Sequence, residues 1–194
     1  VIQVSREAQN AILLFGGSNR AVDEAYADRV LAQFGAGDIL LLQNEISALP
    51  YILEKAHARG MEIWLNPSPM NENVLKCNLS LVSVFVLNEV EGEQLTDTKN
   101  PTAILDKLLQ KYPHAAAVLT LGSKGAWYAK EDKRAFAPAE LVRAVDTTAA
   151  GDTFTGYFMR GMLDGLSPKK SLTLAAKAAA IAVSRPGAAP SIPL

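Results

Sequence analysis

The sequence contains little cysteine and little histidine. Cys77 is the only cysteine among 194 residues, so no intrachain disulfide can form and a cysteine-based zinc site is disfavoured. The two histidines, His57 and His114, lack the spacing of paired metal ligands, and both are expected at the surface. A single cysteine is typical of a protein from a reducing compartment, which predicts a cytoplasmic location.

An excess of charge and a long apolar run are also missing. Lysine and arginine total 19 and aspartate and glutamate total 20, which gives a formal net charge of -1. This balance predicts neither a nucleic acid nor a membrane surface as a partner. The apolar runs are far shorter than the ~20 residues that span a bilayer. The composition, 49% hydrophobic and 20% charged, instead fits one globular domain over residues 1–194.

Several familiar motifs are absent from the sequence. It has no Gly-x-x-x-x-Gly-Lys-Ser/Thr phosphate loop and no Gly-x-Gly-x-x-Gly dinucleotide fingerprint. It has no Gly-x-Ser-x-Gly nucleophile elbow either, which weakens a hydrolase interpretation. An interpretation as a dinucleotide-dependent oxidoreductase therefore loses its main support.

Short apolar runs alternate with segments of helical periodicity. Strands are predicted at residues 1–4, 11–15, 38–43, 61–65, 81–87, 115–121 and 126–129, with another ending near Val145. Helices are predicted at residues 22–34, 47–59, 89–95, 102–111, 153–163 and 168–184. The first two strands should form a hairpin through residues 5–10. The remaining alternation predicts a parallel sheet with helices on its faces and ligands beyond the strands' carboxyl ends.

Some finer expectations follow from the same patterns. The apolar positions of the first helix, Val22, Tyr26, Val30 and Phe34, should face the core, and Ser47 should cap the second helix. The strand at residues 38–43 should be buried on both faces. In the helix after residue 152, the stripe Phe154, Tyr157, Phe158 and Met162 is more typical of a core than of a base-stacking platform. Gly156 and Gly161 should allow close packing of that helix.

The segment from Val145 to Phe154 carries the strongest chemical signal. The small residues Ala149, Ala150 and Gly151 precede a helix, so their N–H groups and the helix dipole would form an anion site suited to a phosphoryl group. Asp152 beside it is a candidate general base. From spacing alone, the interpretation of Asp152 as a helix cap is favoured over the role of a base.

Two other segments lie where a strand ends. Asn88-Glu89-Val90-Glu91 could hold magnesium, directly or through water, or could simply place acidic side chains in the first turn of a helix. Gly122-Ser123-Lys124-Gly125 lies between two strands, so a hairpin turn is its default interpretation.

Together these segments resemble the ribokinase-like (PfkB) carbohydrate kinase family over nearly the whole chain. Asp146-Thr147-Thr148-Ala149-Ala150-Gly151-Asp152-Thr153-Phe154 looks like the family's C-terminal signature, and Asn88 and Glu91 match its Asn-x-x-Glu motif. The segment from Leu119 to Gly125 matches its nucleotide-binding strand and turn. Asn66-Pro67-Ser68-Pro69 and the tail from Ser184 to Ser191 are similar to the ribokinase branch of the family.

The resemblance implies a fold and an activity. The fold would be a three-layer α/β/α arrangement with a mostly parallel central sheet, and the activity would be ATP-dependent phosphorylation of a hydroxyl of ribose or a related sugar. The expected partners are the sugar, ATP, Mg²⁺ and K⁺. Family members also carry N-terminal strands, a glycine-rich sugar grip, most of a small β lid and a closing C-terminal helix that this sequence lacks, so residues 1–194 would be the C-terminal two-thirds of the fold. The apolar surface left exposed would then predict self-association. The resemblance implies the same, because family members form homodimers.

The resemblance also assigns roles to single residues. Asp152 would be the base and would contact the sugar, with Ala149, Ala150 and Gly151 holding the transferring phosphoryl group. The nucleotide would be bound by Asn88, Thr120, Gly122, Gly125 and Ala176, although Ala176 replaces a larger polar residue and offers no side-chain contact. Glu91 would hold Mg²⁺, directly or through water. The monovalent cation would lie beside Asp146, Thr148, Ala182, Arg185, Gly187 and Ser191.

Glu45, which follows the strand at residues 38–43, would contact the sugar, unless it is a solvated loop residue.

Two rival functions remain. The chain could be a catalytically inactive nucleotide-binding remnant of a sugar kinase. It could also belong to a kinase for another alcohol, such as a nucleoside, fructose or pyridoxal.

Overall fold

The structure, a computed structural model, describes residues 2–4, 10–13 and 15–193. Its strands are β1 (Ile2–Val4), β2 (Asn10–Ile12), β3 (Ile39–Gln43), β4 (Glu62–Asn66), β5 (Val84–Asn88), β6 (Ala116–Thr120), β7 (Ala126–Lys130) and β8 (Lys133–Ala137). Its α-helices are α1 (Glu24–Leu31), α2 (Leu49–Ala58), α3 (Glu72–Leu75), α4 (Glu89–Thr96), α5 (Pro101–Lys111), α6 (Ala150–Leu163) and α7 (Pro168–Val183). Short 3-10 helices lie at Gly17–Ala21, Leu79–Leu81, Gly122–Lys124 and Ala189–Ser191.

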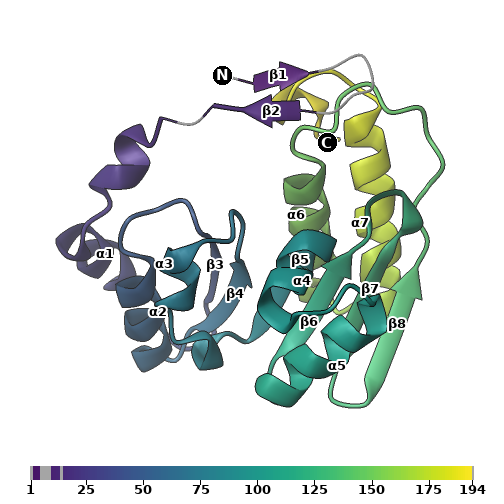
Figure 1. Ribbon diagram of the computed structural model, residues 1–194. Helices are drawn as coiled ribbons and strands as arrows, with labels where there is room; N and C mark the ends of the chain where they lie inside the picture. The colour runs from purple at the N-terminus through teal and green to yellow at the C-terminus, as the bar shows by residue number, and fades with distance from the viewer. Residues whose placement is uncertain (1, 5–9, 14, 194) are drawn as a thin grey trace. The chain divides into compact units, whose positions relative to one another are not determined.

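Six strands form one sheet, in the same order as in the sequence, from β3 to β8 (Figure 1). β3 and β4 pair in parallel with Leu41 opposite Trp64, and β4 and β5 pair in parallel with Leu65 opposite Phe85. Helices connect these parallel strands, because a parallel pair cannot be joined by a tight turn. The α/β alternation and the parallel pairing predicted from the sequence are confirmed.

The chain divides into two compact units. The first unit comprises Val1–Phe15, Thr120–Tyr128 and Arg134–Leu194, and the second comprises Gly16–Leu119 and Ala129–Lys133. Within the described ranges, no helix is both long enough and apolar enough to cross a bilayer.

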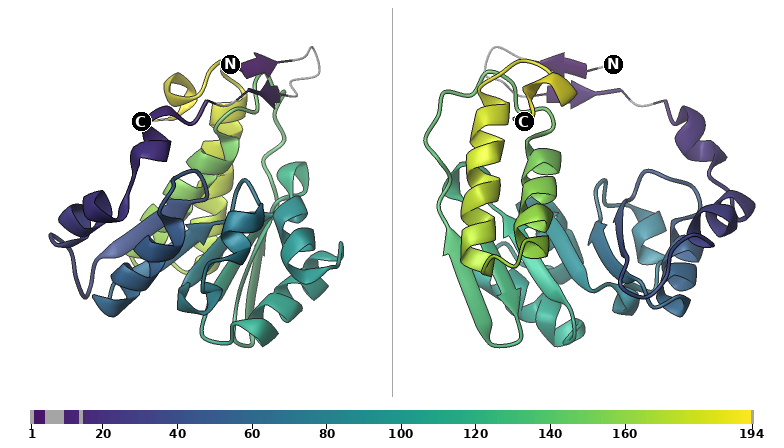
Figure 2. Two further views of the ribbon diagram at one scale, coloured as in Figure 1. Left: turned by 60° about the vertical axis from the view of Figure 1, so that its left-hand side comes forward. Right: turned by 180° about the vertical axis from the view of Figure 1, so that it is seen from behind.

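The core of the first unit forms around α6 and α7, which pack along each other (Figure 2). Phe158 is completely buried, and its ring lies 6.1 Å from that of Tyr128 and 6.4 Å from that of Phe154, centroid to centroid. Gly161 is buried where a Cβ would lie 2.8 Å from Ser171 Oγ on α7. Phe154 and Phe158 of the predicted stripe therefore belong to the core, whereas Tyr157 and Met162 are half-buried. Gly161 allows the two helices to approach as expected, but Gly156 is exposed with open space where a Cβ would lie, so its predicted role in close packing was wrong.

The core of the second unit is aliphatic with one aromatic pair. Phe85 of β5 is completely buried and contacts the ring of Tyr112, with a centroid distance of 5.1 Å. α2 packs on β4, and α4 packs on both β5 and α5. The lone Cys77 is buried, and desolvation raises the pKa of its thiol to about 11, so the thiol stays protonated at neutral pH.

The predicted N-terminal hairpin is confirmed. β1 and β2 pair antiparallel, with Gln3 opposite Ala11 and Val4 opposite Asn10. The parts of this prediction that fall on residues 1, 5–9 and 14 lie outside the described residues, as does Leu194.

The first helix differs from its prediction. It begins after Asp23, whose Oδ1 accepts a hydrogen bond of 2.7 Å from the N–H of Tyr26, and ends at Leu31. The buried positions are Ala27 and Leu31, whereas Tyr26 and Phe34 are largely exposed. The predicted core face was therefore wrong, because capping by Asp23 shortens the helix and a small alanine takes the buried side.

Two expectations around β3 were also wrong. Leu41 is 41% exposed, and β3 is an edge strand that pairs, among the described strands, only with β4. Ser47 does not cap α2; Ala48 occupies the N-cap position without a side-chain bond, and Ser47 Oγ donates to the carbonyl of Asn19 at 3.2 Å.

No strand ends near Val145. Residues 138–149, all of them described, form neither helix nor strand. The preceding strand is β8, which the sequence analysis missed because its two charged residues, Lys133 and Arg134, conceal the apolar alternation. The N–H groups of Val145 and Asp146 instead donate to the carbonyl of Val183, at 2.7 and 3.2 Å.

Candidate functional site

A cavity of about 370 Å³ lies within the first unit. Six of the residues assigned above to the anion hole and the nucleotide line it, namely Thr120, Gly122, Gly125, Ala150, Gly151 and Ala176. They come from the end of β6, the following turn, the first turn of α6 and the middle of α7. Segments that are far apart in the sequence therefore converge on one cavity, whereas Asn88, Ala149 and Asp152 are not among its lining residues.

The turn after β6 needs its glycines. The N–H of Leu121 donates to the carbonyl of Gly125 at 2.8 Å, which closes the turn. Gly125 has a φ of +116°, and a Cβ there would collide with the backbone carbonyl of Ala137. Only glycine fits this conformation without strain. The segment is thus the predicted turn, and it also lines the cavity.

The first turn of α6 borders the cavity through Ala150 and Gly151. Ala149 adopts the left-handed conformation, with φ of 60°, and the N–H of Thr153 donates to its carbonyl at 2.9 Å. The N–H of Ala150 makes a longer bond of 3.3 Å to the carbonyl of Thr147. Gly151 falls in the first turn, where no intrahelical acceptor exists, and the space around its missing Cβ is open. This helix end suits an anion.

Asp152 is the third residue of α6, and its side chain is exposed. The N-cap position belongs to Ala149, which makes no side-chain cap bond. The interpretation of Asp152 as a helix cap is therefore wrong. The carboxylate of Asp152 lies in the first turn of α6, at the positive end of the helix dipole.

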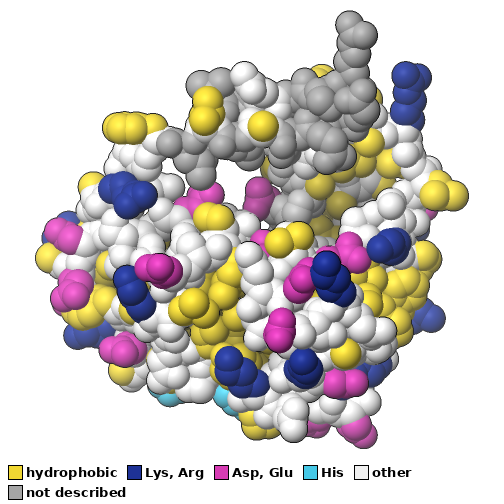
Figure 3. Space-filling view, in the orientation of Figure 1, with side chains coloured by type: hydrophobic (Ala, Val, Ile, Leu, Met, Phe, Trp, Pro, Cys, Tyr) yellow, Lys and Arg dark blue, Asp and Glu magenta, His cyan; other side chains and the backbone are white. Residues whose placement is uncertain are grey.

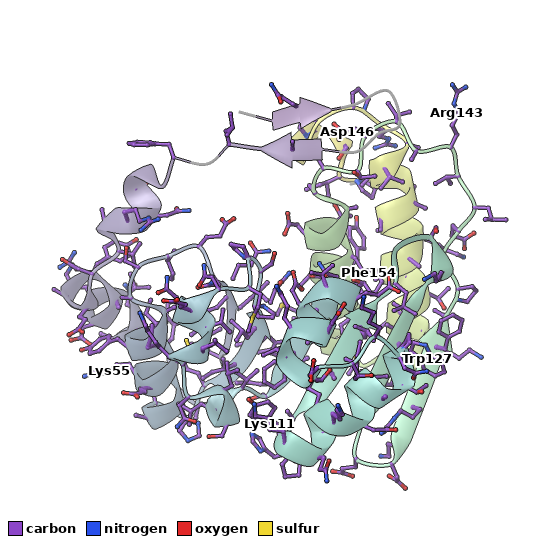
Figure 4. All side chains as sticks on the ribbon, in the orientation of Figure 1. Lys55, Lys111, Trp127, Arg143, Asp146 and Phe154 are labelled. Atoms are coloured by element: carbon purple, nitrogen blue, oxygen red, sulfur yellow. The ribbon has the colours of Figure 1, made fainter. Side chains whose placement is uncertain are left out.

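Asp146 organises the loop before α6 (Figure 4). It is 9% exposed; Oδ1 accepts from the N–H of Thr148 and Oδ2 from the N–H of Gly187, both at 2.9 Å. Hydrogen bonds from Thr148 and Gly187 hold the pKa of this carboxyl below its ordinary value. Asp146 is thus ionised at neutral pH.

The residues assigned to the monovalent cation lie on this loop, in the last turn of α7 (Ala182) and on the segment after it. Asp146 joins Thr148 to Gly187, and Arg185 Nη1 donates to the carbonyl of Ser191 at 3.5 Å. The carbonyl of Ala182 accepts from the N–H of Arg185 at 3.0 Å. Thr148 Oγ1 is buried without a hydrogen-bond partner among the described residues. A buried carboxylate beside an unpaired hydroxyl fits a cation that takes oxygen ligands.

In the second unit, Asn88 and Glu91 form a capping box at the start of α4. Asn88 Oδ1 accepts from the N–H groups of Val90 and Glu91, at 2.9 and 3.0 Å. The buried carboxylate of Glu91 accepts from the backbone N–H and Nδ2 of Asn88, at 2.9 and 3.0 Å. Both carboxylate oxygens are thus engaged, which fits a magnesium contact through water better than a direct one. One Nδ2–H of Asn88 remains for a ligand.

Glu45 is exposed in the loop after β3 of the second unit. The neighbouring Asn44, which the sequence analysis missed, is 4% exposed and fixes this loop. Its Nδ2 donates to the carbonyl of Pro69 at 2.6 Å and to Asn71 Oδ1 at 3.0 Å. Asn44 is a polar residue next to the exposed Glu45, so nothing in the sequence indicates that its side chain is buried.

Charge is spread rather than gathered. On the face shown in Figure 3, Lys and Arg side chains are interspersed with Asp and Glu, as the near-zero net charge leads one to expect. In the part of the chain that the structure describes, no group of three or more histidine, cysteine, aspartate or glutamate side chains could hold a metal ion. A cation would therefore need other oxygen ligands.

Comparison with known proteins identifies the family. The model of the pfkB family carbohydrate kinases matches residues 1–194. The chain belongs to the pfkB family of carbohydrate kinases. Among curated relatives, this pfkB chain is 36% identical over 204 residues to a ribokinase of Schizosaccharomyces pombe and 33% identical over 204 residues to one of Haemophilus influenzae. It is covered to 100% and 99% by these alignments and spans 64% of each relative.

Solved structures agree with the family assignment. A ribokinase of Thermotoga maritima matches 99% of this pfkB chain with a TM-score of 0.77 and 30% identity, over 65% of its own length. A ribokinase of Arabidopsis thaliana, complexed with ribose and ATP, matches 99% of the chain with a TM-score of 0.81 and 28% identity, over 64% of its own length. The predicted ribokinase-like α/β/α fold is thereby confirmed.

Proposed function

We propose that this chain is the nucleotide-binding portion of an ATP-dependent sugar kinase, which transfers the γ-phosphoryl group of ATP to a hydroxyl of ribose or a related sugar. The main support is the single cavity on which the end of β6, its glycine turn, the start of α6 and Ala176 converge. The relatives named ribokinase support the choice of sugar.

In this proposal, Asp152 and Gly151 perform the chemistry. The exposed carboxylate of Asp152 takes the proton of the sugar hydroxyl, a contribution typically worth ~10²–10⁴-fold in rate. The N–H groups at the start of α6, with Ala149, Ala150 and Gly151, hold the negative charge of the transferring phosphoryl group. Positioning and charge stabilisation are what this reaction mainly needs. Glu45 is a further proposed contact of the sugar.

Two cations complete the proposal. Bound Mg²⁺ neutralises charge on the phosphate oxygens. Glu91 reaches it through water, because Asn88 already donates to both carboxylate oxygens. K⁺ is held by Asp146, Thr148 and the carbonyl groups after α7, and it fixes the loop that precedes the anion site. The buried, unpaired hydroxyl of Thr148 supports this assignment.

We also propose that the protein is cytoplasmic and associates with itself. The exposed side chains of Leu13 and Phe15 near β2, and of Leu41 on β3, support self-association, since apolar surface of this kind is usually covered. Size-exclusion chromatography with light scattering tests it, and a monomer at all concentrations contradicts it.

The activity is tested by sugar-dependent ADP release from the purified chain with Mg²⁺ and K⁺. The panel contains ribose, deoxyribose, fructose, a nucleoside and pyridoxal. Release with ribose or a close relative supports the proposal, and release with another alcohol alone redirects the substrate assignment. If the chain binds ADP but no acceptor in the panel stimulates ADP release from ATP, the rival function is supported, a nucleotide-binding module without catalysis.

A further inference from the structure

The segment Asn66-Pro67-Ser68-Pro69, which begins at the end of β4, accepts two hydrogen bonds from the loop that follows β3. The backbone N–H of Asn44 donates to the carbonyl of Ser68 at 2.9 Å, and its Nδ2 donates to the carbonyl of Pro69 at 2.6 Å. β3 and β4 are adjacent parallel strands, so both loops leave the sheet at its carboxyl edge, where ligands of such sheets bind. One residue therefore ties two loops of the second unit together at that edge.

The side-chain amide of Asn44 can take only one orientation. Asn71 Oδ1 accepts from the N–H of Asn73 at 2.9 Å, which identifies this atom as an oxygen. Asn44 Nδ2 donates to the same oxygen at 3.0 Å and to the carbonyl of Pro69, so both of its hydrogens are used. The opposite orientation would set the amide oxygen of Asn44 against two acceptors. The side chain is thus fixed in place.

This orientation leaves one atom of Asn44 unsatisfied. The residue is 4% exposed, and its Oδ1 is buried without a hydrogen-bond partner among the described residues. An unpaired buried carbonyl lowers stability, and positions that keep one in spite of this cost are expected to serve function. The next residue, Glu45, is exposed at the same edge of the sheet.

We infer that Asn44 is a positioning residue for Glu45. Its backbone and side-chain hydrogen bonds fix the backbone from which the carboxylate of Glu45 extends. A carboxylate on a fixed loop loses less conformational freedom when it binds a ligand, so binding is tighter. The ligand is a polyhydroxylated molecule, whose hydroxyl groups donate to the carboxylate. This inference rests on the proposed contact between Glu45 and the sugar.

A double-mutant cycle tests the inference through the KM for ribose in the ADP-release assay of the purified chain. Glu45→Ala should raise the ribose KM, because it removes the carboxylate itself. Asn44→Leu should raise it at least ~3-fold, as coupling between neighbouring residues allows, with kcat and the KM for ATP unchanged. In the Glu45→Ala background, Asn44→Leu should raise the ribose KM no further, because its effect passes through Glu45.

The outcomes of the cycle separate the inference from the proposed function. Additive effects, or an unchanged ribose KM in Asn44→Leu, overturn the inference and leave the proposed function standing. An unchanged ribose KM in Glu45→Ala shows that the proposed contact is wrong and overturns the inference with it. No ADP release with ribose from the wild type contradicts the proposed sugar as well as the inference.

A control variant separates positioning from a loss of stability. Asn100 Oδ1 caps α5 in the same unit, where it accepts from Thr102 Oγ1 and the N–H of Ala103, at 2.7 and 3.1 Å. Asn100→Ala should therefore lower the stability of the second unit and leave the ribose KM unchanged. A rise in the ribose KM equal to that of Asn44→Leu would show that destabilisation alone causes it, and would overturn the inference.

Variants of the exposed Asn71 keep the inference testable if Asn44→Leu does not fold. Asn71→Ala removes one of the two acceptors that hold the amide of Asn44, so it should raise the ribose KM. Asn71→Asp keeps an oxygen at that position and should retain the wild-type KM. Equal ribose KM values for the two Asn71 variants would overturn the inference.

Discussion

The carboxylate of Asp146 accepts a hydrogen bond of 2.9 Å from the backbone N–H of Gly187, 41 residues further along the chain. Its second oxygen accepts from the N–H of Thr148, two residues away. One side chain therefore joins the loop that leads into α6 to the turn that follows α7.

Asp146→Asn should lower the stability of the first unit in a pH-dependent way. Because the folded pKa is lowered, the carboxylate stabilises the fold fully above the ordinary aspartate value of 3.8, and this contribution is lost as pH falls through the folded pKa. The difference in Tm between wild type and variant should thus be largest near neutral pH and shrink in acid. Thermal unfolding by circular dichroism measures it.

Asp132→Asn, in an exposed turn, is the control for this prediction. It should change stability by less than ~0.5 kcal/mol, as surface substitutions usually do. A Tm difference for Asp146→Asn that grows on acidification would contradict the role of the ionised carboxylate.

Two glycines of α6 should respond in opposite directions to alanine. Gly156 is exposed, with open space where a Cβ would lie, so Gly156→Ala should stabilise the protein by ~0.5–1 kcal/mol through helix propensity. At Gly161 a Cβ would lie 2.8 Å from Ser171 Oγ, so Gly161→Ala should destabilise it by ~1–3 kcal/mol. Urea unfolding of both variants measures the difference, and the same sign for both would contradict the packing of α6 on α7.

Variants at Asn88 separate its capping role from its proposed nucleotide role. Asn88→Ala removes the cap of α4 and the donor to the buried Glu91, which should cost ~1–3 kcal/mol. Asn88→Ser keeps an oxygen at the cap and should retain most of that stability. If the remaining amide N–H serves the nucleotide, the serine variant should bind ADP ~3–10-fold more weakly, the worth of one hydrogen bond. Unchanged ADP affinity at retained stability assigns Asn88 to the cap alone.

The sequence predicted the parts of the fold whose patterns are local and strong. The turn between Gly122 and Gly125 and the acidic first turn of α4 at Glu89 and Glu91 each have a short-range cause, which is a positive φ in the first case and the helix dipole in the second. The capping box of Asn88 and Glu91 was not predicted. The resemblance to one family then placed Thr120, Gly151 and Ala176 on one cavity, which no local pattern could do.

The errors arose where tertiary context decides. The pattern of β3 is that of a fully buried strand, but Leu41 is exposed and β3 is, among the described strands, at the edge of the sheet. β8 begins with two charged residues, which conceal its apolar alternation. A glycine in a helix does not reveal whether a neighbour lies against it, so Gly156 and Gly161 could not be distinguished from the sequence. The buried amide of Asn44 likewise depends on contacts with Pro69 and Asn71. Burial and close packing at these positions depend on neighbours that are distant in the sequence and adjacent only in the folded chain.

The central claim is most directly tested by comparing Asp152→Asn with Asp164→Asn. Each substitution neutralises one carboxylate. Asp152 lies in the first turn of α6, whereas Asp164 is the C-cap at the other end, where it forms an exposed ion pair with Arg160. We predict that Asp152→Asn lowers sugar-dependent ADP release by ~10²-fold or more with ADP affinity unchanged, as expected for loss of a general base. Asp164→Asn should turn over like wild type. Full turnover in Asp152→Asn would contradict the account.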